Sequence, residues 1–226
     1  EEKTLRVYNW FDYITPKALE DFKAQNPNVK LVYDIFDTNE ALEAKLLTGN
    51  SGYDVVVPSN VFLAKQVEAG VFQKLDRSKL PNWQHLDPQL MKLIEANDPG
   101  NQYAVPYMWG TTGLIYNTTM VEEPPTKWAD MWDVAYTNNV LMFNNSRDAY
   151  AIAAKTIGLS MNPQSVDEIT AITDALKAQK NIVQAYVMDE VFDKMEGGEA
   201  AMAPYYAGDA ITMIAENPDL AFVHPE

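Results

Sequence analysis

The stretch at residues 53–70 reads YDVVVPSNVFLAKQVEAG, and it decides the fold class. Its first part, Tyr53–Val57, ends in a run of valines, which is typical of a parallel strand covered on both faces. Pro58 ends the run, and the apolar spacing that follows is helical up to Gly70. A strand that leads directly into a helix is the repeating element of parallel α/β sheets.

The same alternation of strand and helix occurs twice before this stretch. Thr4–Asn9 alternates apolar and polar residues like a strand, and a helix is predicted from Pro16, with Thr15 as its N-cap. A second strand at Val29–Tyr33 precedes a helix at Asn39–Thr48. Three such alternations indicate a parallel sheet with right-handed crossovers.

The second half of the chain repeats this pattern after a strong turn signal at Asp98–Asn101. In chain order, we expect extended segments at Tyr103–Tyr107 and Gly113–Asn117, a strand at Val140–Phe143, helices at Arg147–Ile157, Val166–Gln179 and Val187–Met195, a strand at Ala200–Pro204, a helix at Gly208–Glu216 and a strand at Leu220–Val223. The sequence therefore predicts two α/β lobes, at residues 1–107 and 108–226, with a cleft between them.

Composition narrows the classes of partner. The 226 residues include 17 Lys and Arg against 32 Asp and Glu, a net charge of −15. This excess of negative charge argues against nucleic acids and anionic lipid surfaces as binding partners, and it favours a small cationic ligand. No run approaches the roughly 20 apolar residues that span a membrane, so direct membrane insertion is not expected.

Metal and cofactor chemistry is not expected either. The chain has no cysteine, and its two histidines, His85 and His224, lack a metal-type partner at helical spacing. The Gly-rich phosphate loops of nucleotide-binding proteins are absent. The opening residues have no features of a signal peptide, so we expect that any export signal has been removed or never existed.

Three turns stand where predicted strands end, which is where open parallel sheets bind ligands. They are Asn9–Tyr13, Pro58–Phe62 and Tyr205–Asp209. Each pairs an aromatic ring with a carboxylate or hydroxyl group, a combination that suits an ammonium ion better than a phosphate.

Plainer interpretations of the same residues stay open. Trp10 or Tyr206 alone is also typical of a core or rim aromatic residue, and Asp12 can simply cap a turn. Asp148 and Asp209 are candidate carboxylates for a hydrolase. However, no spacing is specific for glycoside hydrolysis, and no nucleophile stands beside a base.

Several motifs together resemble one family. They read YNWFDYITP (residues 8–16), the stretch from residue 53, YAVPYMWGTTGLIYN (103–117), TKWADMWD (126–133), MFNNSRDAYAIA (142–153) and MEGGEAAMAPYYAGDA (195–210). Their order resembles the spermidine/putrescine-binding proteins of bacterial ABC importers, across essentially the whole chain. The resemblance implies a two-lobed periplasmic-binding-protein fold, with a mostly parallel sheet in each lobe, that closes on its ligand like a hinge.

The resemblance also implies a function. It is the non-catalytic binding of a putrescine- or spermidine-like cation in the cleft between the lobes, for delivery to an ABC transporter permease. The expected location is periplasmic or extracellular, with a membrane-anchored lipoprotein as one form of the precursor. By position in the motifs, the expected ligand-binding residues are Trp10, Phe11, Asp12, Tyr13, Ser59, Val61, Phe62, Asp148, Tyr206 and Asp209.

Three positions depart from the family pattern. Phe11 stands where the family usually has Ser or Thr, Val61 where a polar residue or Tyr is common, and Asn145 where spermidine receptors tend to have Asp. These changes make the site more apolar and less charged. They favour a ligand with one ammonium group and a larger apolar body.

The family's chains are longer than this one, and their return segment to the first lobe carries an aromatic residue and an Asp of the ligand site. We therefore expect this chain to lack the C-terminal return segment, which would lie on the same or another polypeptide.

The two halves of the chain resemble different members of the family. Residues 1–117 look most like putrescine receptors, whereas those from about 121 look like Gram-positive polyamine receptors. An engineered reporter or split fragment with altered amine specificity is the alternative, and a carboxylate-based hydrolase is a further one.

Overall fold

The computed structural model describes residues 3–226 of the chain. The chain divides into two compact units, Glu1–Trp109 (unit 1) and Gly110–Glu226 (unit 2). The boundary follows Trp109, where the sequence suggested a boundary after residue 107. Each unit contains its own sheet, and the α/β fold class is confirmed.

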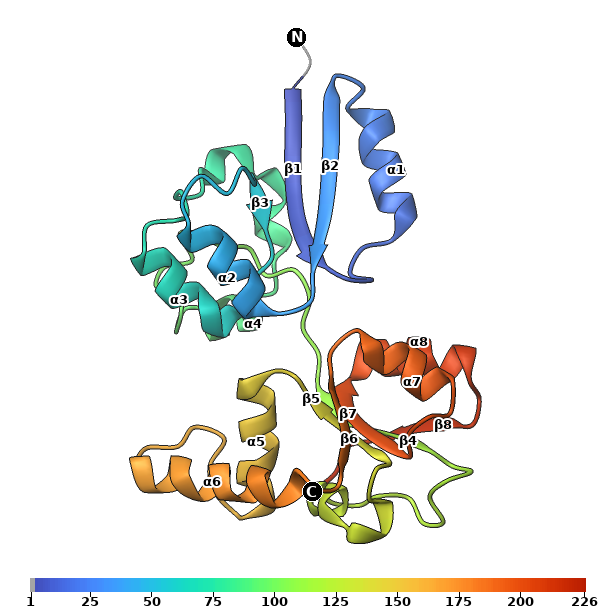
Figure 1. Ribbon diagram of the computed structural model, residues 1–226. Coiled ribbons are helices and arrows are strands. Elements are labelled where there is room, and N and C mark those ends of the chain that lie inside the picture. The colour runs from blue at the N-terminus through green and yellow to red at the C-terminus, as the bar shows by residue number, and fades with distance from the viewer. Residues whose placement is uncertain (1–2) are drawn as a thin grey trace. The chain divides into compact units, whose positions relative to one another are not determined.

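Unit 1 is built from three strands and several helices (Figure 1). In chain order they are β1 (Lys3–Trp10), α1 (Pro16–Gln25), β2 (Val29–Phe36), α2 (Asn39–Leu47), β3 (Val55–Val56), α3 (Asn60–Glu68), the 3-10 helices η1 (Arg77–Lys79) and η2 (Pro81–His85), and α4 (Pro88–Ile94). The predicted N-cap of α1 is confirmed, because Thr15 Oγ1 accepts the N–H of Ala18 at 3.3 Å.

The sheet of unit 1 has the order β2-β1-β3, and both pairings are parallel. Its core cluster consists of Phe36, Leu42 and Leu46, against which the half-buried Tyr8 and Trp10 pack. Since residues two apart on a strand share a face, Tyr8 and Trp10 place the end of β1 on this core. The core thus fixes the strand end from which the first predicted ligand turn starts.

Unit 2 contains five strands (Figure 1). Its elements are β4 (Thr112–Asn117), the 3-10 helices η3 (Trp128–Trp132) and η4 (Val134–Tyr136), β5 (Val140–Phe143), α5 (Ser146–Thr156), α6 (Val166–Gln179), β6 (Val183–Val187), α7 (Glu190–Glu196), β7 (Met202–Tyr206), α8 (Ala207–Glu216) and β8 (Leu220–Val223).

The sheet of unit 2 has the order β6-β5-β7-β4-β8. β5 pairs parallel with β6 and β7, whereas β4 pairs antiparallel with β7 and β8. Four strands therefore run in one direction and β4 runs against them, so the sheet is mostly parallel. All four residues of β5 are buried, as expected for a central strand covered on both faces.

Two predicted elements are wrong in detail. Tyr103–Tyr107 is not a strand, because the buried Asp98 carboxylate binds the N–H groups of Tyr103 and Ala104 and holds this backbone in a turn. The predicted helix from Val187 to Met195 begins only at Glu190. Val187, the first residue of the predicted helix, is instead the last residue of β6 (Val183–Val187), a strand that was not predicted.

Gly113 in β4 is a position where the fold requires glycine. A Cβ built on it would lie 2.3 Å from Cζ of Phe222 and 2.6 Å from the carbonyl oxygen of Val223. We expect Gly113→Ala to lower the free energy of unfolding by about 1–3 kcal/mol, since the neighbouring strand β8 would have to shift. Chemical denaturation of the purified chain measures this loss.

Gly208 in α8 provides the matched control, because a Cβ there would meet no atom within 4 Å. Gly208→Ala should leave stability unchanged or raise it slightly, since alanine favours a helix. Equal stability of the two variants would contradict the close approach of β4 and β8.

None of the helices at residues 3–226 combines the length and the apolar character that crossing a membrane requires.

Candidate functional site

Asp148 lies in the first turn of α5, which starts where β5 ends. Asn145 is the N-cap, and its Oδ1 accepts the N–H groups of Arg147 at 3.1 Å and Asp148 at 3.3 Å. This local pattern explains why the helix starts here, since asparagine is among the best N-cap residues. It also places a carboxylate at the positive end of the helix dipole.

The Asp148 carboxylate is part of a compact polar group with Asn145 and Tyr206. The Tyr206 hydroxyl donates to Asp148 Oδ2 at 2.6 Å, and Asn145 Nδ2 donates to the same oxygen at 2.9 Å. Asn145 Nδ2 also lies 3.4 Å from the Tyr206 hydroxyl oxygen. The three residues come from the ends of β5 and β7, which are neighbours in the sheet.

Burial governs the protonation of this group. It raises the pKa of the Asp148 carboxyl above its ordinary value, and the hydrogen bond from Tyr206 partly opposes this shift. Burial and the nearby Asp148 charge both raise the pKa of the Tyr206 hydroxyl, which therefore stays protonated and donates. The arrangement holds one carboxylate charge in a poorly solvated place where a cation would compensate it.

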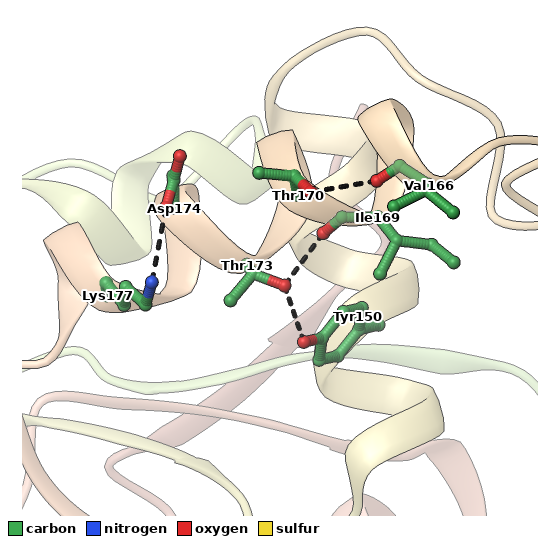
Figure 2. Close-up of polar contacts among 7 residues, drawn as sticks. All are labelled: Tyr150, Val166, Ile169, Thr170, Thr173, Asp174 and Lys177. Carbon is green, nitrogen blue, oxygen red and sulfur yellow. Dashed lines mark hydrogen bonds and ion pairs between the residues drawn. The ribbon is translucent and has the colours of Figure 1, made fainter.

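Helix α6 fixes the position of α5 (Figure 2). The hydroxyl of Tyr150, two residues after Asp148 on α5, is hydrogen-bonded to Thr173 Oγ1 at 2.7 Å. Thr173 Oγ1 in turn donates to the carbonyl oxygen of Ile169 at 2.7 Å. Buried Ala153 on α5 packs in the same core cluster as residues of α6. The helix that presents Asp148 is therefore anchored on its far side.

Tyr205 and Asp209 extend the polar group of unit 2. The rings of Tyr205 and Tyr206 lie 4.9 Å apart, and Tyr205 is 3% exposed. Burial, and next the charge of Asp209 in the first turn of α8, raise the pKa of the Tyr205 hydroxyl. The Tyr206 hydroxyl thus joins Asp148 to the Tyr205 and Tyr206 ring pair, and the Asp209 charge acts on the Tyr205 hydroxyl of the same pair.

Trp10 is the last residue of β1 in unit 1. Its indole N–H donates to the carbonyl oxygen of Val57 at 2.8 Å, and its ring centroid lies 4.5 Å from that of Phe36. The half-buried ring is therefore held between the end of β3 and the core of the unit. This contact brings Trp10 close to the second predicted ligand turn, which starts directly after Val57.

The second turn is organised by a buried asparagine. Asn39 Nδ2 donates to Ser59 Oγ at 3.0 Å, and the Ser59 N–H donates to Asn39 Oδ1 at 2.9 Å. In the helix that follows, Val61 is 53% exposed whereas Phe62 is 4% exposed. Val61 is thus accessible and Ser59 is half-buried, whereas the Phe62 ring packs inside the unit.

The turn after Trp10 is exposed at its tip. Phe11 is 44% exposed, and Asp12 has a positive φ of 47°. Tyr13 is held by Tyr107, whose hydroxyl donates to the Tyr13 carbonyl oxygen and whose ring lies 5.6 Å from the Tyr13 ring. Sequence reasoning missed Tyr107 and Asn39 as supporting residues. Helical or strand periodicity gives no signal for contacts between segments so far apart.

The raised pKa of Asp148 predicts opposite pH responses of binding and stability. Because a cation needs the ionised carboxylate, the affinity of this carboxylate for any cationic ligand should fall as the pH is lowered through this raised pKa. The folded chain holds the proton more tightly than the unfolded one. The contribution of Asp148 to stability is therefore largest below the unfolded pKa, and it is lost as the pH rises through the folded pKa.

Affinity and thermal unfolding measured from about pH 4 to about pH 8 test this expectation, with Asp148→Asn as the reference protein. In this variant, neither the affinity nor the stability should show the pH dependence that comes from ionisation of Asp148. A wild-type affinity that stays constant as the pH falls would contradict a cation-binding role of Asp148.

Among residues 3–226, no group of three or more His, Asp or Glu side chains could hold a metal ion.

The two units define a class of protein. Each is an α/β layer that presents aromatic, hydroxyl and carboxylate side chains at the carboxyl ends of its strands, as in proteins that bind small polar ligands. Residues 17–226 match the family model of the bacterial extracellular solute-binding proteins, and the chain belongs to this family. The expected kinship with bacterial solute receptors is confirmed.

Individual relatives agree with this assignment. The chain is 40% identical over 220 residues to the putrescine-binding periplasmic protein SpuD of Pseudomonas aeruginosa and 38% identical over 224 residues to the putrescine-binding periplasmic protein PotF of Escherichia coli. Each match covers 92% of this chain, which spans 60% of the length of either relative. A putative spermidine/putrescine ABC transporter structure from Listeria monocytogenes superposes with a TM-score of 0.91 at 35% identity, over 99% of this chain and 69% of the other.

Proposed function

We propose that this protein binds a small cationic amine of the putrescine or spermidine type without catalysing a reaction. The observation that carries the proposal is the half-buried Asp148 carboxylate. Its Oδ2 accepts hydrogen bonds from Tyr206 and Asn145, which hold the carboxylate in place. We propose that Oδ1 accepts from an ammonium group. Charge-assisted hydrogen bonds of this kind are stronger than neutral ones.

The proposed binding residues in unit 1 are Trp10, Asp12 and Ser59. Those in unit 2 are Asp148, Tyr206 and Asp209. An aromatic face attracts an ammonium ion by about 0.5–2 kcal/mol, and the half-buried Trp10 and Tyr206 rings fit this role. We expect Phe62 to support the turn from inside unit 1, since its ring is buried.

The names of the relatives support an amine as the ligand, since SpuD and PotF are putrescine-binding proteins. We further propose delivery of the amine to an ABC permease and a periplasmic or extracellular location. A lipid anchor on the precursor stays a prediction. The relatives give no support to the hydrolase alternative.

A thermal-shift series tests the proposal. Ligands that bind only the folded state raise its melting temperature, and the stabilisation grows with the logarithm of the ratio of ligand concentration to Kd. We expect putrescine or spermidine to stabilise the chain, and agmatine and simple quaternary amines define the selectivity. A folded chain whose melting temperature does not change with any of these amines would contradict the proposed function.

Phe11 and Val61 offer a prediction about selectivity. Because they are 44% and 53% exposed, neither side chain fills the core of unit 1. We expect the double substitution Phe11→Ser and Val61→Ser to bind linear polyamines about fivefold more tightly, the value of one added hydrogen bond of about 1 kcal/mol. Its melting temperature should remain close to that of the wild type.

Leu47→Ser is the control for this experiment, since Leu47 is 55% exposed at the end of α2. It removes a similar apolar side chain from the surface of the same unit and should leave affinity unchanged. A double variant with unchanged polyamine affinity would remove Phe11 and Val61 from the site. A large loss of stability would show that they pack in the core instead.

A further inference from the structure

Ser59 precedes α3 at the N-cap position, but its side chain does not cap the helix. Serine at this position normally accepts an N–H of the first helical turn with its hydroxyl oxygen. Here Ser59 Oγ instead accepts the side-chain N–H of Asn39, the first residue of α2. The hydroxyl is therefore directed by a neighbouring helix rather than by its own.

Asn39 is well suited to hold Ser59. It is 6% exposed, and it binds both the hydroxyl oxygen and the backbone N–H of this one residue. The cap of α2 does not involve Asn39, because Thr38 Oγ1 accepts the N–H of Ala41 at 3.1 Å. The Asn39 side chain is thus free of helix capping, and both of its polar atoms are used on Ser59.

This arrangement determines what the Ser59 hydroxyl can offer. A hydroxyl group has one hydrogen and two lone pairs. The Asn39 N–H takes one lone pair at a fixed direction, which leaves the other lone pair as the acceptor for an incoming donor. An ammonium group can only donate hydrogen bonds. The remaining lone pair of Ser59 Oγ is therefore already oriented to accept one of its N–H groups.

The geometry points to Asn39 as a positioning residue for amine binding, which acts through Ser59. The inference rests on the proposed function and adds a residue that would not itself touch the ligand. A pre-oriented acceptor binds more tightly than a freely rotating one, because less side-chain freedom is lost on binding. Asn39 should therefore affect affinity only while Ser59 carries its hydroxyl.

A double-mutant cycle tests the inference. Wild type, Asn39→Ala, Ser59→Ala and the double variant are titrated calorimetrically with putrescine and with spermidine, and their thermal unfolding is recorded. We expect each single substitution to weaken binding about fivefold, the loss of one hydrogen bond. In the Ser59→Ala background, Asn39→Ala should cause no further loss of affinity, although it still lowers the melting temperature.

If Asn39→Ala does not fold, Asn39→Leu replaces it in the cycle, because leucine has a similar volume but can neither donate to Ser59 Oγ nor accept the Ser59 N–H. Equal losses of affinity in both backgrounds would overturn the inference, since Asn39 would then act through stability alone. A folded wild type that binds neither amine would overturn the proposed function and the inference together. The two failures are therefore distinguishable.

Discussion

Asp148→Asn is expected to weaken putrescine binding by about ten- to a hundredfold, since a hydrogen bond to a charged group contributes about 1.5–3 kcal/mol. The substitution keeps the size of the side chain and an acceptor for the Tyr206 hydroxyl, but it removes the charge that an ammonium group would neutralise. Stability at neutral pH should be retained or slightly increased, because burial already disfavours the ionised form. Calorimetric titration and thermal unfolding of the same samples measure both quantities.

The control is Asp174→Asn on α6, where the aspartate is 65% exposed and pairs only with Lys177 at 3.5 Å among the ion pairs of the described residues. It removes the same charge from the same unit, so it corrects for the general effect of net charge on a cationic ligand. It should change affinity little. Similar losses from Asp148→Asn and Asp174→Asn would show that the effect is long-range electrostatics rather than a contact.

Asp98→Ala is expected to cause the largest loss of stability, about 3 kcal/mol or more. The Asp98 carboxylate is fully buried and accepts the backbone N–H groups of Gln102, Tyr103 and Ala104 at 3.1, 2.9 and 3.0 Å. Removing it leaves three donors without their acceptor, and each unsatisfied buried group costs about 1–3 kcal/mol. Chemical denaturation gives the difference in unfolding free energy.

Asp87→Ala is the matched control, because Asp87 also accepts two backbone N–H groups, at 2.7 and 3.2 Å, but is exposed at the start of α4. The loss of such an N-cap costs about 1 kcal/mol. Asp98→Ala should exceed this value clearly. Equal losses would mean that the turn at residues 98–104 is hydrated and does not depend on its buried carboxylate.

Local signals explain which elements were predictable. The strand-to-helix stretch at residue 53 and the Thr15 N-cap are read from neighbouring residues, and both elements are present, with β3 shorter than expected. The segment Tyr103–Tyr107 was misread as extended, because its backbone is bound by the side chain of Asp98. Apolar spacing carries no information on such a side-chain-to-backbone turn.

The candidate site was predictable in part for the same reason. Asp148 and Tyr206 follow strand ends and match a known motif, so their types and positions were apparent, and the structure joins them by a hydrogen bond of 2.6 Å. The roles of Asn39 and Tyr107 depend on contacts across 20 and 94 positions of the chain. Only the folded arrangement of α2, α3 and the first turn reveals them.

The pKa of the Asp148 carboxyl, followed by NMR of isotope-labelled aspartate side chains with and without spermidine, tests amine binding at Asp148 most directly. The account predicts a raised pKa in the free chain and a lower pKa once the amine is bound, because a nearby positive charge favours the ionised form. An Asp148 pKa that is the same with and without spermidine would contradict the account.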